Sequence, residues 1–421
     1  MRPNSTVNRT STVRTYKYRI YLAKDQLANI QNQFSMCRHL FNWSLAERKA
    51  AYDKDKTVLS YYDQANKLPA LKAERPWFQG VYSQVLQDVL QRVNLAYQAF
   101  YRYGAIHGIR PNKNGKKLIG YPNFKKYGQW NTLTYPICPS LPVNGKLYIP
   151  KVGEVRITMH RELPLEAQVK TMSITCVAGK YYTCFTWEAS LPQPVLKQAL
   201  PAIGIDMGCK NFVYVSDGSK VEPPLVHYNS LHQRLVVLQK RLSKAEKGTL
   251  RKKKLLLRVQ KVHAKIANLR KEFHHKTANM LLAKSNLMII EDLDIKQMLK
   301  RPNKILDDLG KPLPNGASYK AKLHKGIAEM GWYSFTTIMK YKADALGKAI
   351  LRINPNFTSQ LCSSCGSRNR LLPNQRHYCC KACGYEDDRD SNASKNILKL
   401  GLAVVVRERD PYVLELAGLA C

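Results

Sequence analysis

Hydrophobic positions in the first half of the chain follow a strand period, then a helical period, then a strand period again. Residues 16–22 alternate polar and apolar side chains, which predicts a strand. From Asp25 to about Tyr103 the apolar residues recur at helical intervals. Short strand patterns return at 147–149 and 155–159, and longer ones flank Ala178-Gly179 as a predicted hairpin. The pattern therefore predicts a β-domain, residues 1–22 and 106–197, interrupted by a helical domain at 23–105.

The second half contains short apolar runs that end in acidic residues. The run at 202–205 ends at Asp206, and the run at 287–290 ends at Glu291. Between them a helical region extends from about residue 229 to 284, and Gly248 divides it into at least two helices. Pro- and Gly-rich residues 300–318 predict a loop, which is followed by a helix over 331–346 and a strand at 351–354. Because 421 residues exceed one ordinary core, we predict a multidomain α+β protein.

The charge of the chain indicates a polyanionic partner. The formal net charge is +38, and residues 231–284 carry 16 Lys and Arg against two Glu. A charged run is ordinarily a solvated helix face, but an excess of one sign favours a surface that faces phosphate groups. Nucleic acid is therefore the expected partner, bound in a salt-dependent manner. A membrane is not expected, because the sequence has no run of about 18 apolar residues and no signal-like segment after Met1.

Of the 11 cysteines, only the late ones are patterned. Two Cys-x-x-Cys-Gly turns, Cys362 with Cys365 and Cys380 with Cys383, provide four sulfur ligands at the spacing of a small zinc ribbon. Cys379 is an alternative third ligand, and a disulfide framework is the alternative interpretation. The other cysteines are scattered, which suits a reducing cytoplasm better than secretion. A closed four-cysteine zinc site has no open position, so its predicted role is structural.

Three acidic residues that end or follow apolar elements are candidate metal ligands, namely Asp206, Glu291 and Asp390. Strand ends of a mixed sheet bring distant segments together, and three converging carboxylates repel one another unless cations lie between them. Oxygen ligands suit Mg²⁺ or Mn²⁺, and two such ions about 4 Å apart can support phosphodiester hydrolysis. Each of these residues, taken alone, could instead be a helix cap or an acidic residue on the protein surface. The alternative ligands are neighbouring acids, Asp292 or Asp294 in place of Glu291 and Asp388 in place of Asp390.

Other hydrolase motifs are missing from the sequence, which contains no Gly-x-Ser-x-Gly, His-Glu-x-x-His or Walker-type Gly-Lys-Ser/Thr. The acidic stretch that contains Asp390 is followed by helix-prone residues 394–400. Along the chain, the second half therefore contains a strand that ends in Asp206, the basic helices, a strand that ends in Glu291, the cysteine ribbon, and finally Asp390 followed by a helix.

This order resembles the TnpB family of RNA-guided endonucleases of insertion sequences, which is related to type V CRISPR effectors. The specific motifs are Gly-Ile-Asp-Met-Gly at 204–208, Ile-Glu-Asp-Leu at 290–293 and Asp-Arg-Asp-Ser-Asn-Ala-Ser at 388–394, together with the cysteine turns. Weaker N-terminal motifs at 37–42 and 96–100 extend the resemblance to essentially the whole chain.

The resemblance implies an RNase H-like (RuvC) nuclease domain at 198–357 and 389–421, interrupted by a zinc ribbon at 358–388. It implies that the preceding β-domain is a β-barrel-like wedge domain and that its helical insertion is a recognition domain. Asp206, Glu291 and Asp390 would be the catalytic metal ligands. The wedge and recognition domains would hold a transposon-derived guide RNA paired with target DNA, so that base pairing supplies most of the sequence specificity.

Proteins of this family also read a short DNA motif beside the target. Matching the stretch that ends at 96–100 places Ser83 and Gln87 one turn apart on the reading helix, with Tyr61 or Tyr62 beside them. Gln87 could make a bidentate contact with adenine in the major groove. Ordinary polar helix surface is the alternative interpretation. Two further aromatic residues among basic loops could stack on bases or pack in the core, namely Trp130 and Tyr135.

We therefore predict an RNA-guided, Mg²⁺-dependent DNA endonuclease with one protein per guide RNA and one nuclease site that cuts both target strands in turn. A miniature type V CRISPR effector with an array-derived guide is the alternative within the same class. An RNA-guided repressor that does not cut is disfavoured by the complete acidic triad. The remaining alternative is an RNA-independent transposase, which RNase treatment before a cleavage assay would distinguish.

Overall fold

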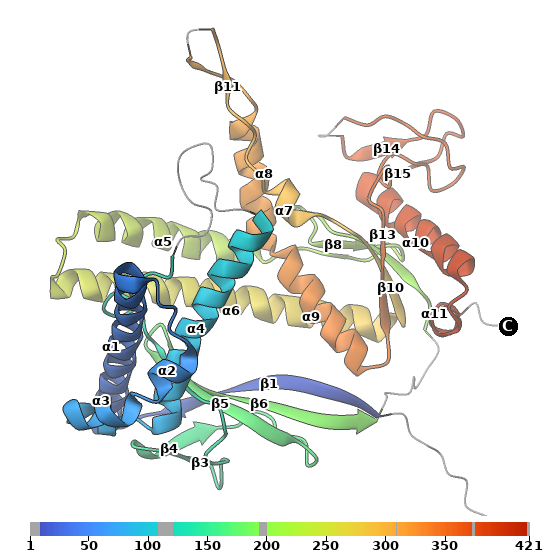
Figure 1. Ribbon diagram of the computed structural model, residues 1–421. Helices are drawn as coiled ribbons and strands as arrows, with labels where there is room; N and C mark the ends of the chain where they lie inside the picture. Colours follow the sequence, from blue (N-terminus) through green and yellow to red (C-terminus); the bar gives the residue numbers. More distant parts are fainter. Residues whose placement is uncertain (1–8, 108–120, 193–199, 309, 373–374, 419–421) are drawn as a thin grey trace, which may run out of the picture. The chain divides into compact units, whose positions relative to one another are not determined.

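The computed structural model describes residues 9–107, 121–192, 200–308, 310–372 and 375–418 (Figure 1). The chain forms two compact units, Met1–Pro192 and Gln193–Cys421. The domain boundary predicted at residue 197 lies outside the described residues. Within the described ranges, no helix is both long enough and apolar enough to cross a membrane.

The first unit contains a six-stranded sheet of order β2-β5-β6-β1-β4-β3. Its strands are β1 Arg9–Tyr21, β2 Thr132–Tyr135, β3 Lys146–Ile149, β4 Gly153–Thr158, β5 Gln168–Val177 and β6 Lys180–Pro192. All neighbouring strands are antiparallel, and β1 pairs with β6 along almost its whole length. In the part of the chain that is described, β2 and β3 are the sheet edges, so hydrogen bonding does not close the sheet into the expected barrel.

The predicted hairpin is confirmed. Ala178 and Gly179 join β5 to β6, and both residues have positive φ, at 52° and 77°. A two-residue turn with two positive φ values matches the right-handed twist of the strands that it connects. The predicted first strand is also present, but it begins at Arg9 because its N-terminal half continues the pairing with β6.

Helical segments follow β1: α1 Lys24–Asp55, α2 Tyr61–Ala65, α3 Leu68–Glu74, the 3₁₀ segment η1 Pro76–Gly80 and α4 Ser83–His107. They pack onto the sheet through one continuous hydrophobic core. Ile30 of α1, Leu86 of α4 and Tyr18 of β1 are all fully buried in this core. The helical insertion and the β-sheet therefore form one packed unit.

The second unit is built on a mixed sheet of order β13-β10-β7-β8-β9. Its strands are β7 Ile203–Asp206, β8 Val213–Val215, β9 Lys220–Val221, β10 Leu287–Glu291 and β13 Ala349–Ile353. β7, β10 and β13 are mutually parallel, and β8 and β9 continue the sheet in antiparallel fashion. Strands buried on both faces have continuous apolar runs, and residues 287–290 are all buried. The strands predicted before Asp206 and Glu291 are confirmed.

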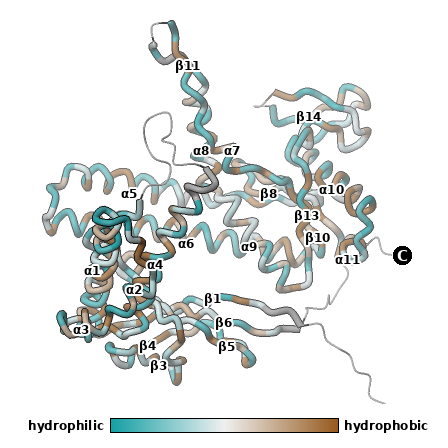
Figure 2. The backbone as a smooth tube through the Cα atoms, in the orientation of Figure 1, coloured by the Kyte–Doolittle hydropathy of each residue, from teal (hydrophilic) through white to brown (hydrophobic). Residues whose placement is uncertain are grey.

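Two long basic helices leave and return to this sheet. They are α5 Leu225–Lys244 and α6 Leu250–Lys284, and the predicted break at Gly248 is confirmed by its positive φ of 88°. An apolar seam joins them, to which Leu231 and Leu235 of α5 and Val259 and Val262 of α6 contribute. Teal and brown segments alternate along both helices in Figure 2, as expected of amphipathic helices.

Shorter elements complete the second unit: α7 Ile295–Met298, β11 Ile305–Leu306, β12 Pro312–Leu313, α8 Ala317–Met330, α9 Trp332–Ala345, β14 His377–Cys379, β15 Glu386–Asp388, α10 Arg389–Glu408 and α11 Pro411–Leu416. The segment expected to be a loop at 300–318 contains the β11–β12 hairpin. The helix α10 begins before the helix-prone stretch at 394–400, because the Asp388 carboxylate caps it. That carboxylate accepts hydrogen bonds from the backbone N–H groups of Asp390 (2.8 Å) and Ser391 (3.4 Å).

Candidate functional site

Asp206 and Glu291 lie at the same edge of the second sheet. Asp206 ends β7 and Glu291 ends β10, and these parallel strands are in register with Ile290 opposite Ile205. The two acidic residues therefore follow directly after paired positions. Apolar residues before them are buried in the sheet, which carries the carboxyl groups to the strand ends.

The helix α10 brings Asp390 to the same place because a glycine lets the helix approach β7. A Cβ atom on Gly204 would lie 2.2 Å from the backbone oxygen of Ser394 and 2.6 Å from the backbone nitrogen of Leu398. Farther along α10, a Cβ atom on Gly401 would lie 2.4 Å from the side chain of Ile289 in β10. Asp390 stands in the first turn of this helix and is buried.

The electrostatics of Asp206 show that the three carboxyl groups share one environment. Burial, followed by the charges of Glu291 and Asp390, raises the pKa of Asp206 to about 8, and Arg389 opposes this shift. Burial also raises the pKa of Glu291. The Thr358 hydroxyl donates a hydrogen bond to Glu291 Oε1 at 2.5 Å and favours its charged form.

Two arginines partly neutralise Asp390. Arg376 Nη1 lies 3.3 Å from Asp390 Oδ2, and Arg389 Nη2 lies 3.2 Å from Asp390 Oδ1. Sequence reasoning did not identify either arginine as part of the site. Arg389 adjoins Asp390 in the sequence motif, whereas Arg376 comes from the ribbon, and no sequence pattern marks its role.

The alternative acids have other roles in the structure. Asp292 lies 3.0 Å from Arg352 Nη1 and its side chain is 63% exposed. Asp294 caps α7 by accepting a hydrogen bond from the backbone N–H of Gln297. Asp388 caps α10. Of the acids considered at each position, the structure therefore brings together Asp206, Glu291 and Asp390.

A hard divalent cation fits this donor set. The groups are carboxylates, Asp390 is buried and the other two are half-buried, and burial followed by the charges of Glu291 and Asp390 raises the pKa of Asp206. A bound cation relieves this repulsion. In the described residues their oxygens do not yet form a cluster within 4.8 Å, and the Asp390 carboxylate is held by the two arginines. Binding a cation at all three groups requires their oxygens to move closer together.

The four predicted cysteine ligands do form a cluster. Their sulfur atoms lie within 4.8 Å of one another, with 3.7 Å between Cys362 and Cys383 and 3.6 Å between Cys365 and Cys380. Tetrahedral zinc with Zn–S bonds of about 2.3 Å places its sulfurs about 3.8 Å apart, so the cluster fits zinc. Cys379 is not part of the cluster. The Ser367 hydroxyl lies 3.1 Å from Cys380 Sγ, and zinc binds its cysteine ligands as thiolates.

The ribbon is held by the same helix that carries Asp390. The Asn392 side chain accepts a hydrogen bond from the backbone N–H of Ser363 (2.8 Å) and donates one to the backbone oxygen of Leu361 (2.7 Å). Asn396 donates to the backbone oxygens of Thr358 (2.9 Å) and Leu361 (2.6 Å), and Lys399 donates to that of Ser363. Sequence reasoning did not identify this polar stripe. Its signal is the spacing of Asn392, Asn396 and Lys399 on one helix face.

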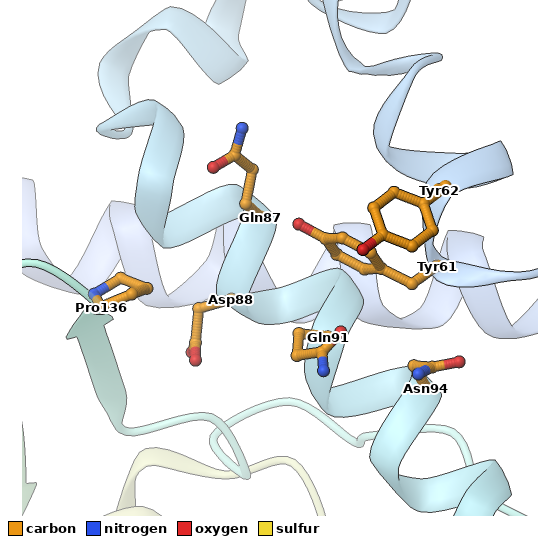
Figure 3. A pocket seen from close by; sticks show the side chains of 7 residues that line it. All are labelled: Tyr61, Tyr62, Gln87, Asp88, Gln91, Asn94 and Pro136. Carbon is orange, nitrogen blue, oxygen red and sulfur yellow. The ribbon is translucent and has the colours of Figure 1, made fainter.

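Three of the four residues proposed to read a DNA motif line one cavity in the first unit. This cavity has a volume of about 510 Å³ and is bordered by Tyr61, Tyr62 and Gln87. Figure 3 shows the two tyrosines on one side of the cavity and Gln87, Gln91 and Asn94 spaced along α4. Ser83 does not line the cavity, and its hydroxyl accepts a hydrogen bond from Lys72 Nζ at 2.6 Å.

Gln91 and Asn94 were missed by sequence reasoning, although they follow Gln87 at helical spacing. Trp130 and Tyr135 are buried in the core of the first unit, so packing is the interpretation that the structure supports for both.

Three family models match separate parts of the chain. Residues 185–302 match a model described as "Probable transposase", residues 332–397 match "Cas12f1-like, TNB domain", and residues 12–57 match "Helix-turn-helix domain". In this structure the last range consists mainly of β1 and α1. The second range contains α9, β13 and the four cysteines.

Curated relatives match most of the chain. "Putative RNA-guided DNA endonuclease InsQ" of Escherichia coli (strain K12) is 28% identical over 93% of this chain and 93% of its own length. A protein of Streptomyces pristinaespiralis with the same description, apart from the InsQ designation, is 29% identical over 93% of this chain and 90% of its own length. "CRISPR-associated endodeoxyribonuclease Cas12f1" of Sulfoacidibacillus thermotolerans is 26% identical over 61% of this chain and 59% of its own length.

Proposed function

We propose that this relative of the TnpB family is an RNA-guided DNA endonuclease that cleaves double-stranded DNA beside a short motif. The relatives that match 93% of the chain carry the description of RNA-guided DNA endonucleases. The observation that carries the nuclease proposal is the set of three carboxyl groups at one edge of the second sheet, of which Asp390 is buried and Asp206 and Glu291 are half-buried. The net charge of +38 supports a nucleic-acid partner.

Under this proposal Asp206, Glu291 and Asp390 are the catalytic residues and would hold Mg²⁺ or Mn²⁺, with two ions expected. Such ions activate a water molecule and stabilise the leaving oxygen of a phosphodiester. The chain positions the ligands: the Thr358 hydroxyl fixes one oxygen of Glu291, and α10 holds Asp390 against the end of β7. Partial burial reduces the contact of Asp206 with bulk water, which strengthens its interaction with a cation.

The same proposal assigns a role to each domain of the chain. Residues 198–357 and 389–421 would form an RuvC-like nuclease domain, a division supported by the strand order with three parallel and two antiparallel strands. Residues 358–388 would be a ribbon that binds one structural zinc ion through its four cysteines. Residues 1–22 and 106–197 would be the wedge, and 23–105 would be the recognition segment.

The basic helices would hold the phosphate backbone of the guide RNA and target DNA. Base pairing would select the target, while Gln87, Tyr61 and Tyr62 would read the adjacent motif from their shared cavity. Gln87 offers a donor and an acceptor that match adenine in the major groove. Ser83 is a weaker part of this proposal, because Lys72 occupies its hydroxyl. One protein per guide RNA, acting in a prokaryotic cytoplasm, completes the proposal.

The experiment that tests this function separates binding from cutting. The protein is purified from cells that carry its native flanking DNA, and the bound RNA is sequenced. Cleavage and binding of a matching target are then measured for the wild type, for Asp206→Ala and for Asp292→Ala as the exposed control. We expect a discrete RNA that extends into the flank, and we expect Asp206→Ala alone to lose cleavage while it retains binding.

The outcomes also distinguish the alternatives. Substantial cleavage by Asp206→Ala would contradict the catalytic assignment. Random RNA fragments, together with cutting that survives RNase treatment, would favour a transposase. A bound RNA that derives from a repeat array would identify a CRISPR effector.

A further inference from the structure

A second cavity of the first unit adjoins the motif-reading cavity along α4. Its volume is about 230 Å³, and Asn94 lines both cavities. The walls come from α1, from residues 57–60, from α4 and from Tyr121. Pockets for drug-sized ligands typically measure about 300–1,000 Å³, so this cavity suits a group no larger than one small ring system.

The wall of this cavity contains a buried cation whose hydrogen bonds are incomplete. Arg48 is only 7% exposed, and it lines the cavity. Its Nε donates to Gln64 Oε1 at 2.7 Å and its Nη1 donates to Asn94 Oδ1 at 3.3 Å. Both partners are neutral, and Nη2 has no hydrogen-bond partner among the described residues. Because a buried donor without a partner is costly, a group with acceptor atoms would stabilise this arrangement.

Tyrosine rings surround the same cavity. Tyr97 is buried, lies 5.4 Å from the Arg48 guanidinium, and has a hydroxyl without a partner among the described residues. Tyr52, Tyr101 and Tyr121 are 40%, 47% and 39% exposed. Exposed aromatic faces around a cationic wall are the surfaces on which unpaired nucleobases stack.

We propose that this cavity binds one unstacked guanine base, an inference that rests on the proposed function for the presence of nucleic acid. Guanine presents two acceptors, O6 and N7, on one edge, and a guanidinium presents only donors. Adenine places an amino donor at the position of O6, so it satisfies the arginine less well. The tyrosines supply the stacking surface and Arg48 supplies the preference for guanine.

The base can come from RNA or from DNA. A guanine in a single-stranded RNA loop is already unstacked, whereas a base in duplex DNA must first be flipped out of the helix. The chemistry of the cavity is the same for both sources, and the sugar attached to the captured base distinguishes them.

The first arm of the test is ultraviolet cross-linking of the full-length protein with its co-purified RNA and target DNA, with no divalent cation added. Mass spectrometry then maps each adduct to a residue and a nucleotide. We expect guanine adducts on the tyrosines of the cavity. A ribose mass identifies RNA as the source and a deoxyribose mass identifies DNA.

The second arm measures affinity after the cross-linked guanine is replaced by an abasic nucleotide. Loss of one stacked base is expected to weaken binding about tenfold. Tyr101→Leu is expected to weaken binding of the intact nucleic acid and to have no further effect on the abasic one. The control Tyr148→Leu, which removes an exposed ring from β3, is expected to have the same effect on binding of the intact and of the abasic nucleic acid.

Arg48→Lys keeps the positive charge but loses the planar guanidinium group, which can donate two parallel hydrogen bonds to guanine. This variant should therefore abolish the preference for guanine over adenine at that position.

Three results would overturn the inference. These are adducts elsewhere on the protein with none in the cavity, adenine adducts in the cavity that match guanine in yield, or equal losses for Tyr101→Leu on intact and abasic nucleic acid. If the proposed function itself is wrong and the protein does not bind nucleic acid, cross-linked adducts on α5 and α6 would be missing as well. This result distinguishes failure of the proposed function from failure of the guanine inference.

Discussion

At the scale of single residues, the candidate nuclease site places three carboxyl groups near one another, and their repulsion reduces the stability of the folded protein. Asp206 is half-buried, and burial, followed by the charges of Glu291 and Asp390, raises its pKa to about 8. Thr358 and the arginines at positions 376 and 389 relieve part of this cost through contacts with Glu291 and Asp390. A site that is stabilised only in part by the protein itself is ready to accept a cation.

The pKa of Asp206 predicts how stability depends on pH in the metal-free protein. The folded state holds the proton up to about pH 8, while the unfolded carboxyl group releases it near pH 4, so folding becomes less favourable as pH rises between these values. Asp206→Asn removes this penalty. We expect its stability advantage over the wild type to grow by roughly 1–3 kcal/mol between pH 5 and pH 8 without added Mg²⁺.

Thermal or denaturant unfolding at the two pH values measures this advantage. Asp292→Asn is the control, because Asp292 is an exposed acid that directly follows β10, the strand parallel to β7, and it pairs with Arg352. An Asp206→Asn variant whose advantage is the same at both pH values, or which has none, would contradict the electrostatic account. Added Mg²⁺ should stabilise the wild type more than Asp206→Asn.

At the scale of elements, α10 connects the two predicted metal sites. Its first turn carries Asp390, Gly204 allows its middle to lie against β7, and its polar stripe holds the first cysteine turn of the ribbon. A change in the ribbon is therefore transmitted to the helix that carries a proposed catalytic ligand.

Asn392→Ala tests this connection. The substitution leaves the buried backbone N–H of Ser363 without its acceptor, which should cost about 1–3 kcal/mol of stability. We expect the variant to release zinc faster to a chromogenic chelator and to cleave target DNA more slowly, while it retains RNA binding. Lys381→Ala, an exposed substitution within the ribbon, is the control. Unchanged zinc release with normal cleavage would show that the hydrogen bonds of Asn392 do not couple the two sites.

The elements also show what sequence patterns can and cannot predict. Apolar runs that end in acids predicted β7 and β10, and the cysteine spacing predicted the cluster, because each depends on local chemistry. The contacts of Arg376 with Asp390 and of Asn392 with Ser363 depend on how the ribbon folds back on α10, which periodicity does not report. The early start of α10 was missed because Asp388 was considered as a metal ligand rather than as a cap. Helical periodicity also does not reveal that α1 and α4 share a core with the sheet.

At the scale of the whole molecule, the net charge of +38 favours association with a polyanion, which in the proposed function is nucleic acid. Arg258, Lys261 and Lys265 are exposed on α6, at spacings that place them near one another on the helix surface. If these residues contact phosphates, each contributes to the counterions that are released on binding.

Replacing all three by Ala should lower the slope of log affinity against log salt concentration by about 2–3, with little effect on which target is chosen. The matched control exchanges Arg258 for Lys and both lysines for Arg, which keeps the charge. Fluorescence anisotropy across a salt series measures both variants. An unchanged slope in the alanine variant would place the phosphate contacts elsewhere on the molecule.

The measurement that tests the central claim most directly is retargeting. The protein is assembled with two RNAs that differ only in their guide segments, and each complex is given the same plasmid, which carries both matching sites, in Mg²⁺. The account predicts that the cut moves to the site that matches the guide and that neither complex of Asp206→Ala cuts. Cutting at one fixed position with both RNAs, or cutting that survives removal of the RNA, would contradict the account.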